Sequence, residues 1–355
     1  MLRRQFLSSL AGVSAISAYP LLAAEPQPIR AAQIGTRHAH ASGKMEAMRA
    51  LPSDYDVVGI AEANDSSRAQ AAKNKAYGEL TWLDETTLLA DKTIALVAIE
   101  TTLEDSTATA ERAIAAGKHI HLDKPGGAKH AAFARMRKQA ETQGLHVQMG
   151  YMLRHQPAFT LLFQAAREGW FGDILEINAT MGKQADPGLR KTLSAIPGHG
   201  MFELGCHLVD AVVTLLGAPN KVTAFAAATK APGDPLLDNQ LAVLEYPKAL
   251  VTLRSHHNDP GGFGRRAFSV IGTKGSMELF PLESGKGSIT LAEKHLDFHS
   301  GRNEFALPQP RGRYDSEFQA LARWIRGQET SPWTAEHDIV VHRTALLAAG
   351  CEIDE

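Results

Sequence analysis

The chain has 355 residues, of which 44% are hydrophobic and 21% are charged, and its formal net charge is −2. This composition is typical of a soluble globular protein, and the length predicts about two domains. Nucleic-acid-binding proteins are usually basic, so the net charge argues against that class. Only Cys206 and Cys351 are present, which excludes a framework of several disulfides.

The first 24 residues have the pattern of an export signal. The basic start Arg3-Arg4-Gln5-Phe6-Leu7 precedes a short run of small and apolar residues that ends at Ala24. Its order resembles the twin-arginine export signal, which is read as an address. Pro20 interrupts the run, so it suits a membrane span poorly. We expect a signal peptide over 1–24, a periplasmic or otherwise exported location, and no stable membrane insertion once the signal is removed. The alternatives are an uncleaved anchor and an accidental basic start.

Strand-like and helical patterns alternate from Ile29 onwards. Strands that alternate with helices indicate a doubly wound parallel sheet. We therefore predict a doubly wound α/β domain of the Rossmann type over 28–150. The expected strands are 29–35, 56–62, 95–100, 119–123 and 145–150, and the clearest helices are 104–117 and 128–143.

The order of strand-like and helical patterns changes after Gly150. Several strand-like runs follow one another without long helices between them, which is typical of a mostly antiparallel sheet with one covered face. We predict a substrate-binding α/β domain with an open sheet over 151–355. Its expected helices are 157–168, 202–216, 316–326 and 335–349, its strands are 174–181, 221–227, 240–246, 249–256, 267–271 and 276–279, and 183–200 is an irregular pocket loop or a plain surface loop.

The first strand ends in Gly35-Thr36-Arg37-His38-Ala39-His40, where a dinucleotide site usually has Gly-x-Gly-x-x-Gly. Only the first glycine is present, although the segment follows a strand and opens a helix, as the motif requires. Glu62 ends the second strand and could accept hydrogen bonds from a ribose diol while repelling a 2′-phosphate, which favours NAD over NADP. Arg37 could contact a pyrophosphate at the helix N-terminus. The alternatives are a solvated acid and a surface arginine.

Three segments together resemble a known family. Ala115-Ala116-Gly117-Lys118-His119-Ile120-His121-Leu122-Asp123-Lys124-Pro125 resembles the Ala-Gly-Lys-His-x-x-x-Glu-Lys-Pro signature of the Gfo/Idh/MocA oxidoreductases. The segment 150–159 resembles the family's link between domains, and 203–210 resembles its Asp-x-Gly-x-His-x-x-Asp helix. The resemblance covers nearly everything after residue 28. It implies that 28–150 is an NAD-binding Rossmann domain. It also implies hydride transfer between a sugar or cyclitol carbon and nicotinamide, and a homodimer or homotetramer formed through the open sheet.

The resemblance also implies residue roles. Lys124 would assist proton transfer at the reacting hydroxyl, while Glu203 and His207 would hold or deprotonate the substrate. This is chemically reasonable, because a histidine can take a proton near neutral pH and an ammonium group stabilises an alkoxide. A cis peptide at Pro125 is one way to orient the lysine. The predicted catalytic residues are Lys124, His207 and Glu203; the cofactor-binding residues are Gly35, Thr36, Arg37, His38, Glu62, Thr101, Thr102, Asp123 and Lys124; and the substrate-binding residues are Lys124, Tyr151, Arg154, Lys183, Glu203 and His207.

Three positions depart from the family pattern. Asp123 replaces the usual glutamate, and Glu203 replaces the usual aspartate. Glu100-Thr101-Thr102 stands where the family often has Thr-Pro-Asn, which leaves the role of Glu100 open. For Tyr151, core packing is as good an interpretation as pocket lining, and Arg154 would line or brace the pocket.

Three histidine pairs raise the question of a metal. They are His38 with His40, His119 with His121, and His256 with His257. In the sequence, no cysteine or carboxylate completes an obvious ligand set, so packed or solvent-facing histidines are the preferred interpretation and no metal is predicted.

The leading functional hypothesis is an NAD-dependent oxidoreductase that acts on CH–OH groups of a sugar or sugar-like polyol. An exported enzyme has little access to fresh NAD, so we expect the cofactor to be held tightly. The first alternative is a glycoside hydrolase that oxidises, eliminates, hydrates and reduces its substrate with the same NAD molecule. The second is a non-enzymatic sugar or nucleotide sensor, which would need neither Lys124 nor His207.

Overall fold

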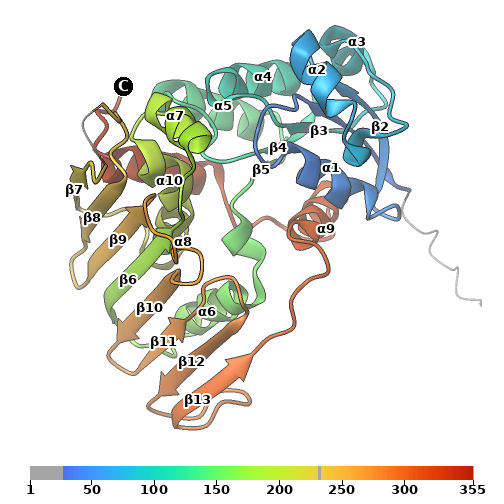
Figure 1. Cartoon of the computed structure of the whole chain (residues 1–355). Coiled ribbons are helices and arrows are strands. Elements are labelled where there is room, and N and C mark those ends of the chain that lie inside the picture. Colours follow the sequence, from blue (N-terminus) through green and yellow to red (C-terminus); the bar gives the residue numbers. More distant parts are fainter. Residues whose placement is uncertain (1–26, 231–232, 355) are drawn as a thin grey trace, which may run out of the picture.

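The computed structural model describes residues 27–230 and 233–354, so the predicted signal lies outside the described residues. Within these ranges, a five-stranded sheet and an eight-stranded sheet form the centres of two layered units (Figure 1). The smaller sheet is parallel, and the larger is antiparallel apart from one strand pair. This confirms the predicted fold class, an N-terminal Rossmann sheet followed by an α/β domain with a mostly antiparallel sheet.

The Rossmann sheet has the strand order β2-β1-β3-β4-β5. All four residues of β3 are buried and apolar, as expected for a strand covered by helices on both faces. Thr102 caps the next helix by accepting a hydrogen bond from the amide of Asp105. The elements are β1 (Ile29–Ile34), α1 (Ala41–Arg49), β2 (Tyr55–Ala61), α2 (Asp65–Ala71), η1 (Lys75–Tyr77), α3 (Glu85–Ala90), β3 (Leu96–Ile99), α4 (Leu103–Ala115), β4 (His119–Leu122), α5 (His130–Thr142) and β5 (Val147–Met149).

The second sheet has the order β13-β12-β11-β10-β6-β9-β8-β7, and β6 and β9 are its parallel neighbours. Its strands alternate buried and more exposed residues, because helices cover one face and leave the other open (Figure 1). The elements are η2 (Met152–His155), α6 (Pro157–Arg167), β6 (Ile174–Gly182), α7 (Pro187–Ala195), η3 (Met201–Gly205), α8 (Cys206–Leu216), β7 (Lys221–Ala227), β8 (Asn239–Glu245), β9 (Leu250–His256), β10 (Ala267–Gly272), β11 (Gly275–Leu279), β12 (Lys286–Leu291), β13 (Gly301–Ala306), α9 (Asp315–Ile325) and α10 (Ala335–Ala348).

The segment 183–200 is more regular than the sequence analysis predicted, because it contains helix α7. The Asp186 side chain accepts a hydrogen bond from the amide of Leu189 at 2.8 Å, and Pro187 occupies the first turn. An aspartate cap followed by proline is a helix-start signal, which here stands among glycines, prolines and lysines that favour a loop. The sheet also extends beyond the expected strands through β12 and β13.

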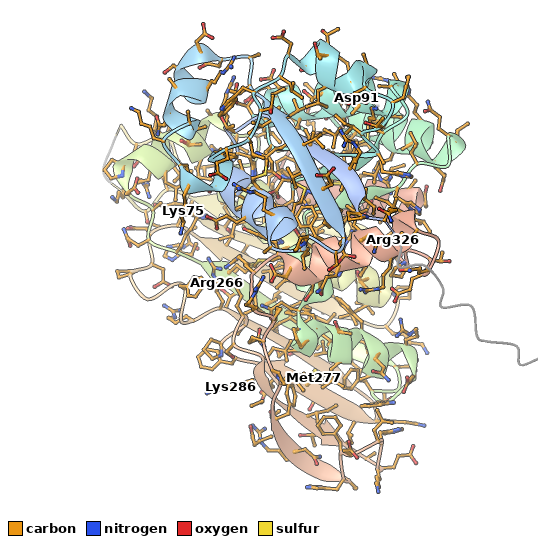
Figure 2. All side chains as sticks on the ribbon, turned by 90° about the vertical axis from the view of Figure 1, so that its right-hand side faces the viewer. Lys75, Asp91, Arg266, Met277, Lys286 and Arg326 are labelled. Atoms are coloured by element: carbon orange, nitrogen blue, oxygen red, sulfur yellow. The ribbon has the colours of Figure 1, made fainter. Side chains whose placement is uncertain are left out.

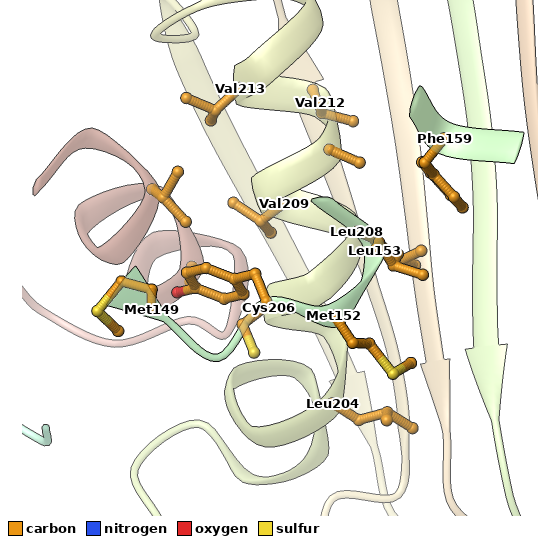
Figure 3. Packing of buried hydrophobic residues seen from close by; sticks show 14 of the residues in the cluster. Met149, Met152, Leu153, Phe159, Leu204, Cys206, Leu208, Val209, Val212 and Val213 are labelled. Atoms are coloured by element: carbon orange, nitrogen blue, oxygen red, sulfur yellow. The ribbon is translucent and has the colours of Figure 1, made fainter. Parts of the chain in front are cut away.

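The two units share buried side chains. In Figure 3, Val209, Val212 and Val213 lie along α8, and Leu153 lies beside Leu208 in the same apolar cluster, which continues into the Rossmann domain. Near the end of the chain, α9 returns to the Rossmann sheet and packs there through residues such as Phe318. Arg326, directly after α9, donates to Asp54 Oδ1 at 2.6 Å (Figure 2). The C-terminal helices therefore hold the two units together.

His342 of α10 lies at this junction. Its ring stacks on Phe133 of α5 with centroids 4.3 Å apart, and the ring of Phe202 of η3 packs against it edge-on, with centroids 5.6 Å apart. Its Nε2 lies 3.0 Å from the carbonyl oxygen of Gly127 and can donate to it. Burial lowers the pKa of His342 to about 4, so the folded chain holds this imidazole neutral.

This burial predicts acid sensitivity. An unfolded histidine titrates near pH 6.5, so the unfolded chain binds more protons than the folded chain from there down to about pH 4. The contribution of neutral His342 to the free energy of unfolding is therefore fully present above pH 6.5, and about 2 kcal/mol of that contribution is lost by pH 5. At pH 7 the His342→Phe variant should be less stable than the natural protein by about 1 kcal/mol, because the hydrogen bond to Gly127 is lost. At pH 5 this difference in the free energy of unfolding should vanish or reverse, because phenylalanine does not titrate.

Urea unfolding at pH 7 and pH 5 measures this difference. The control is His299→Gln, because His299 is exposed in a surface loop. A deficit for His342→Phe that is the same at both pH values would contradict the assignment.

Candidate active site

Lys124 lies directly after β4, at the carboxyl edge of the parallel sheet. Its side chain is 1% exposed, and its Nζ donates to the carbonyl oxygen of Glu203 at 2.7 Å and to Glu203 Oε1 at 2.8 Å. The Lys124–Pro125 peptide is cis, as the sequence analysis anticipated. The two predicted catalytic residues thus meet, although one belongs to the Rossmann domain and the other to the second domain.

Glu203 is placed by η3, a π-helical turn that leads into α8. Such turns are rare and occur frequently at functional sites. In the single regular helix expected over 202–216, the spacing of Glu203, His207 and Asp210 would place all three on one face. The π turn changes that spacing: Glu203 pairs with Lys124, whereas Asp210 pairs with Arg154.

Lys124 and Glu203 each stabilise the charged form of the other. Burial lowers the pKa of Lys124, but the attraction of Glu203 and the smaller contributions of Cys206 and Asp123 together outweigh burial and raise the pKa above its usual value. Burial raises the pKa of Glu203, and the charges of Lys124 and then Lys183 more than reverse that effect. Lys183 Nζ lies 3.6 Å from Glu203 Oε2, and its side chain is 27% exposed. Both members of the pair are therefore ionised, and the site reaches solvent on the Lys183 side.

His207, in the first turn of α8, is buried beside this pair. Burial lowers its pKa well below 6.5, and the positive charge of Lys124 lowers it further. Its Nδ1 is buried and has no hydrogen-bond partner within the described part of the chain. The site thus combines a neutral imidazole with an ammonium group, which is a suitable pair for removing a proton from a hydroxyl and stabilising the oxyanion left behind.

Tyr151 and Arg154 lie behind the reacting groups. The Tyr151 ring packs edge-on against His207, with centroids 6.0 Å apart. Arg154 is buried, and its Nη2 donates to Asp210 Oδ1 at 2.6 Å and to Asp338 Oδ1 at 2.7 Å. These carboxylates bind the Arg154 guanidinium, so its observed contacts brace Tyr151 and α8.

A separate cavity of about 450 Å³ lies where β1, β2 and β3 end. In open parallel sheets, ligands bind where the strand order reverses, and here that point lies between β1 and β3. Four of the predicted cofactor residues line this cavity, namely Gly35, Arg37, Glu62 and Thr101. The other polar residues of its wall include Asn64, Asp84, Glu85, Asp105 and Arg112.

The cavity walls fit the adenosine half of a dinucleotide. Gly35 has a φ of +90°, and a Cβ there would lie 2.8 Å from the backbone of Glu100, so the turn requires glycine. Glu62 Oε2 accepts from the amide and hydroxyl of Thr36, each at 2.8 Å, and Oε1 accepts from the amide of Asn64 at 2.9 Å. A carboxylate has about four acceptor positions, which leaves room for a ribose hydroxyl. Thr102, by contrast, is bound to Asp105 at the start of α4.

The remaining predicted cofactor residues, His38 and Asp123, lie on the Lys124 side. Asp123 Oδ1 accepts from the Lys124 amide at 2.7 Å, and Asp123 Oδ2 lies 3.2 Å from His38 Nδ1 and 3.0 Å from His40 Nδ1. Burial lowers the pKa of His38, but Asp123 and Glu100 outweigh it and raise that pKa to about 10 when no other cation is bound. Glu100, whose role was open, faces this group from the end of β3.

Several polar residues near the site have no local sequence signal. Lys44 of α1 forms an ion pair with Glu317 of α9, and His121 Nε2 lies 3.1 Å from Glu317 Oε1. All three are buried, although a lysine on the covered side of a helix would not be expected. His257 is also buried, and burial followed by the charge of Lys183 lowers its pKa to about 4. These contacts join residues that are far apart in the chain.

Among residues 27–230 and 233–354, no helix is both long and apolar enough to cross a membrane.

Comparisons with known proteins agree with this architecture. The model of the oxidoreductase family with an NAD-binding Rossmann fold matches residues 29–151, and the model of the GFO/IDH/MocA C-terminal domain matches residues 159–278. An uncharacterized oxidoreductase of Schizosaccharomyces pombe is 26% identical over 295 residues, which cover 79% of this chain and 78% of the relative. Trans-1,2-dihydrobenzene-1,2-diol dehydrogenase of Bos taurus is 27% identical over 262 residues, covering 71% of this chain and 74% of that enzyme.

A solved structure of levoglucosan dehydrogenase in complex with NADH and levoglucosan shares the fold, with a TM-score of 0.77 and 20% identity, covering 91% of this chain and 98% of that one. The two family models together span most of the chain, one on each domain. This chain therefore belongs to the Gfo/Idh/MocA family of oxidoreductases with an NAD-binding Rossmann fold.

Proposed function

We propose that this protein is an NAD-dependent oxidoreductase that oxidises a secondary hydroxyl of a sugar or sugar-like polyol. The observation that carries the proposal is the position of neutral His207 beside the buried Lys124–Glu203 ion pair at the carboxyl edge of the Rossmann sheet. The comparison with levoglucosan dehydrogenase supports the substrate class through its fold alone.

The side chains divide the proton chemistry between them. Loss of a hydride from a carbon requires loss of the proton from its hydroxyl, and neutral His207 can accept that proton. The Lys124 ammonium stabilises the negative charge that develops on the oxygen. Glu203 holds Lys124 in place and keeps it charged, and its other oxygen faces Lys183 on the open side of the site. We assign Lys183 to a substrate hydroxyl or carboxylate.

NAD, when bound, supplies the acceptor for the hydride. Gly35, Arg37, Glu62 and Thr101 would hold its adenosine and pyrophosphate portions. The cavity is rich in carboxylates, and Arg112 is already bound to Glu85 through contacts of 2.6 and 3.2 Å. A 2′-phosphate would be repelled by Glu62, so this arrangement favours NAD over NADP.

We also propose that the protein is exported and retains its NAD. The support is the pattern of residues 1–24, which lie outside the described residues, and the scarcity of free NAD outside the cytoplasm. The same site would suit the second candidate, a glycoside hydrolase that oxidises and later reduces its substrate with one NAD molecule. Export favours this candidate, because its cofactor needs no exchange.

The open face of the larger sheet supports a homodimer or homotetramer. Phe225, Leu250 and Ile271 belong to this face and are 55%, 60% and 43% exposed. In the strand register, Leu250 of β9 and Ile271 of β10 both lie opposite Glu176 of β6, so their side chains share one side of the sheet. Exposed apolar side chains grouped on one face are typical of an interaction surface.

The main experiment begins with the purified protein. Mass spectrometry and absorbance should detect NAD that survives gel filtration. Free sugars with added NAD should give NADH if the protein is a dehydrogenase, whereas aryl glycosides without added NAD should release the aglycone if it is a hydrolase. A protein that neither binds NAD nor acts on either panel would contradict the proposal.

Lys124→Met tests the reaction centre. We expect kcat/KM on the active substrate to fall by about 100-fold or more, because the charge that stabilises the oxyanion is lost. NAD titration should still show binding through the separate adenosine cavity. The matched control is Lys138→Met, since Lys138 is exposed on α5 of the same domain. Activity of Lys124→Met equal to the control would refute the assignment of the centre.

Glu62→Ala tests the choice of cofactor. It should weaken NAD binding by about tenfold, as expected when a hydrogen bond to a charged group is lost. It should also narrow the preference for NAD over NADP, because the repulsion of the 2′-phosphate disappears. Fluorescence titration with both reduced cofactors measures this, and Asp65→Ala, at an exposed position outside the cavity, is the control. An unchanged cofactor ratio would count against the role of Glu62.

Leu250→Lys tests the oligomer. Light scattering after gel filtration should show a dimer or tetramer for the natural protein and a smaller species for the variant, because a buried lysine at the interface would lose its hydration. Leu296→Lys is the control, since Leu296 is equally exposed, at 60%, but lies in a loop away from this face. A monomeric natural protein would rule out this surface as a stable interface.

A further inference from the structure

The Rossmann domain contains a second group of polar side chains beside Lys124. His38 and His40 lie in the turn between β1 and α1, Glu100 follows β3, and Asp123 follows β4. Three parallel strands thus direct two imidazoles and two carboxylates towards one place at the same sheet edge. Two histidines with carboxylates form a ligand set suited to a first-row divalent metal.

The distances within this group match a coordination shell. His38 Nδ1 lies 3.2 Å from Asp123 Oδ2 and 3.4 Å from Glu100 Oε2, and His40 Nδ1 lies 3.0 Å from Asp123 Oδ2. One ligand atom from each of His38, His40 and Asp123 falls within 4.8 Å of the others. Around a metal with bonds of about 2.0–2.2 Å, neighbouring ligand atoms are about 3.0–3.5 Å apart.

Glu100 provides an independent observation. Its side chain is completely buried, and neither carboxylate oxygen has a hydrogen-bond donor in good geometry among the described residues. His121 Nδ1 lies 3.8 Å from Oε1, beyond hydrogen-bonding distance. The nearest positive group is His38, whose Nδ1 lies 3.4 Å from Oε2, so a metal ion that took the place of the His38 proton would neutralise this buried carboxylate in the same way. The nearest lysine in the cluster, Lys44, is already paired with Glu317.

The orientation of His38 also favours a cation between the carboxylates. His38 Nδ1 faces both carboxylates, 3.2 Å from Asp123 Oδ2 and 3.4 Å from Glu100 Oε2. A positive charge is favourable at that position, and either the proton of an imidazolium or a metal ion bound to the imidazole can supply it. The His38 and His40 side chains are 21% and 27% exposed, so an ion could reach them from solvent.

We propose that His38, His40, Asp123 and Glu100 bind a divalent transition-metal ion, with Zn²⁺ as the representative. Asp123 precedes Lys124 and accepts its amide, so the ion lies next to the reaction centre. A metal there offers a binding point for substrate oxygens and adds positive charge near Lys124. The site does not depend on the proposed sugar substrate, because it is defined by side chains of the chain itself.

Metal binding can be measured without knowledge of the substrate. Protein treated with a chelator and then desalted is titrated with Co²⁺, which gives a visible spectrum when bound by nitrogen and oxygen ligands, and with Zn²⁺ in a calorimeter. We expect one ion per chain and a rise in Tm with Zn²⁺. His40→Ala should weaken binding at least about tenfold, and Glu100→Gln should change the Co²⁺ spectrum.

The matched control is His146→Ala. His146 and His119 stack with centroids 5.3 Å apart, but within the described residues they belong to no cluster with a carboxylate. Circular dichroism of the metal-free variants separates lost binding from lost folding. The proposal is overturned if the natural protein binds no Co²⁺ or Zn²⁺, or if His40→Ala binds them as tightly as His146→Ala does.

Discussion

The ion pair between Lys124 and Glu203 is the contact on which the candidate site depends. A lysine that is 1% exposed needs a partner, because an unpaired charge in that position is strongly unfavourable. The partner comes from the other domain, so satisfying the charge also fixes the Rossmann sheet against η3 and α8. Breaking such a buried pair typically destabilises a protein by about 3–5 kcal/mol. The same contact keeps Lys124 charged, and burial together with this charge lowers the pKa of His207 and keeps it neutral.

A second level of support surrounds this pair. Arg154 joins Asp210 of α8 to Asp338 of α10, and Asp338 also lies 2.8 Å from Arg137 of α5. This buried network links the helices that carry or flank the reacting groups. Buried charged networks of this kind hold side chains in defined positions because each member requires its partners. The pocket is therefore positioned by polar contacts within an otherwise apolar junction.

The cofactor half and the substrate half of the site are determined by different features of the chain. The cofactor half follows from strand order and turn geometry, since Gly35 and Glu62 end neighbouring strands whose carboxyl edges coincide. The substrate half joins the ends of β4, β6 and η3, which lie in different domains. The cluster of His38, His40, Asp123 and Glu100 lies between these halves, and so any ion there would adjoin both the cofactor and the substrate.

The sequence alone was sufficient for the alternating domain, the antiparallel second sheet and the family resemblance, because these depend on local periodicity and contiguous motifs. It offered a cis peptide at Pro125 as one way to orient Lys124, and the structure shows that peptide. It also marked Lys124, Glu203 and His207 as candidates. It could not show the π turn after which Glu203 pairs with Lys124 while Asp210 pairs with Arg154. The tertiary structure alone brought Asp123 and Glu100 to His38 and His40, because strands distant in the chain end at one edge of the parallel sheet. For the same physical reason, the sequence does not place these side chains together: the carboxylates are adjacent to the histidines in space but 60 or more positions away in the chain.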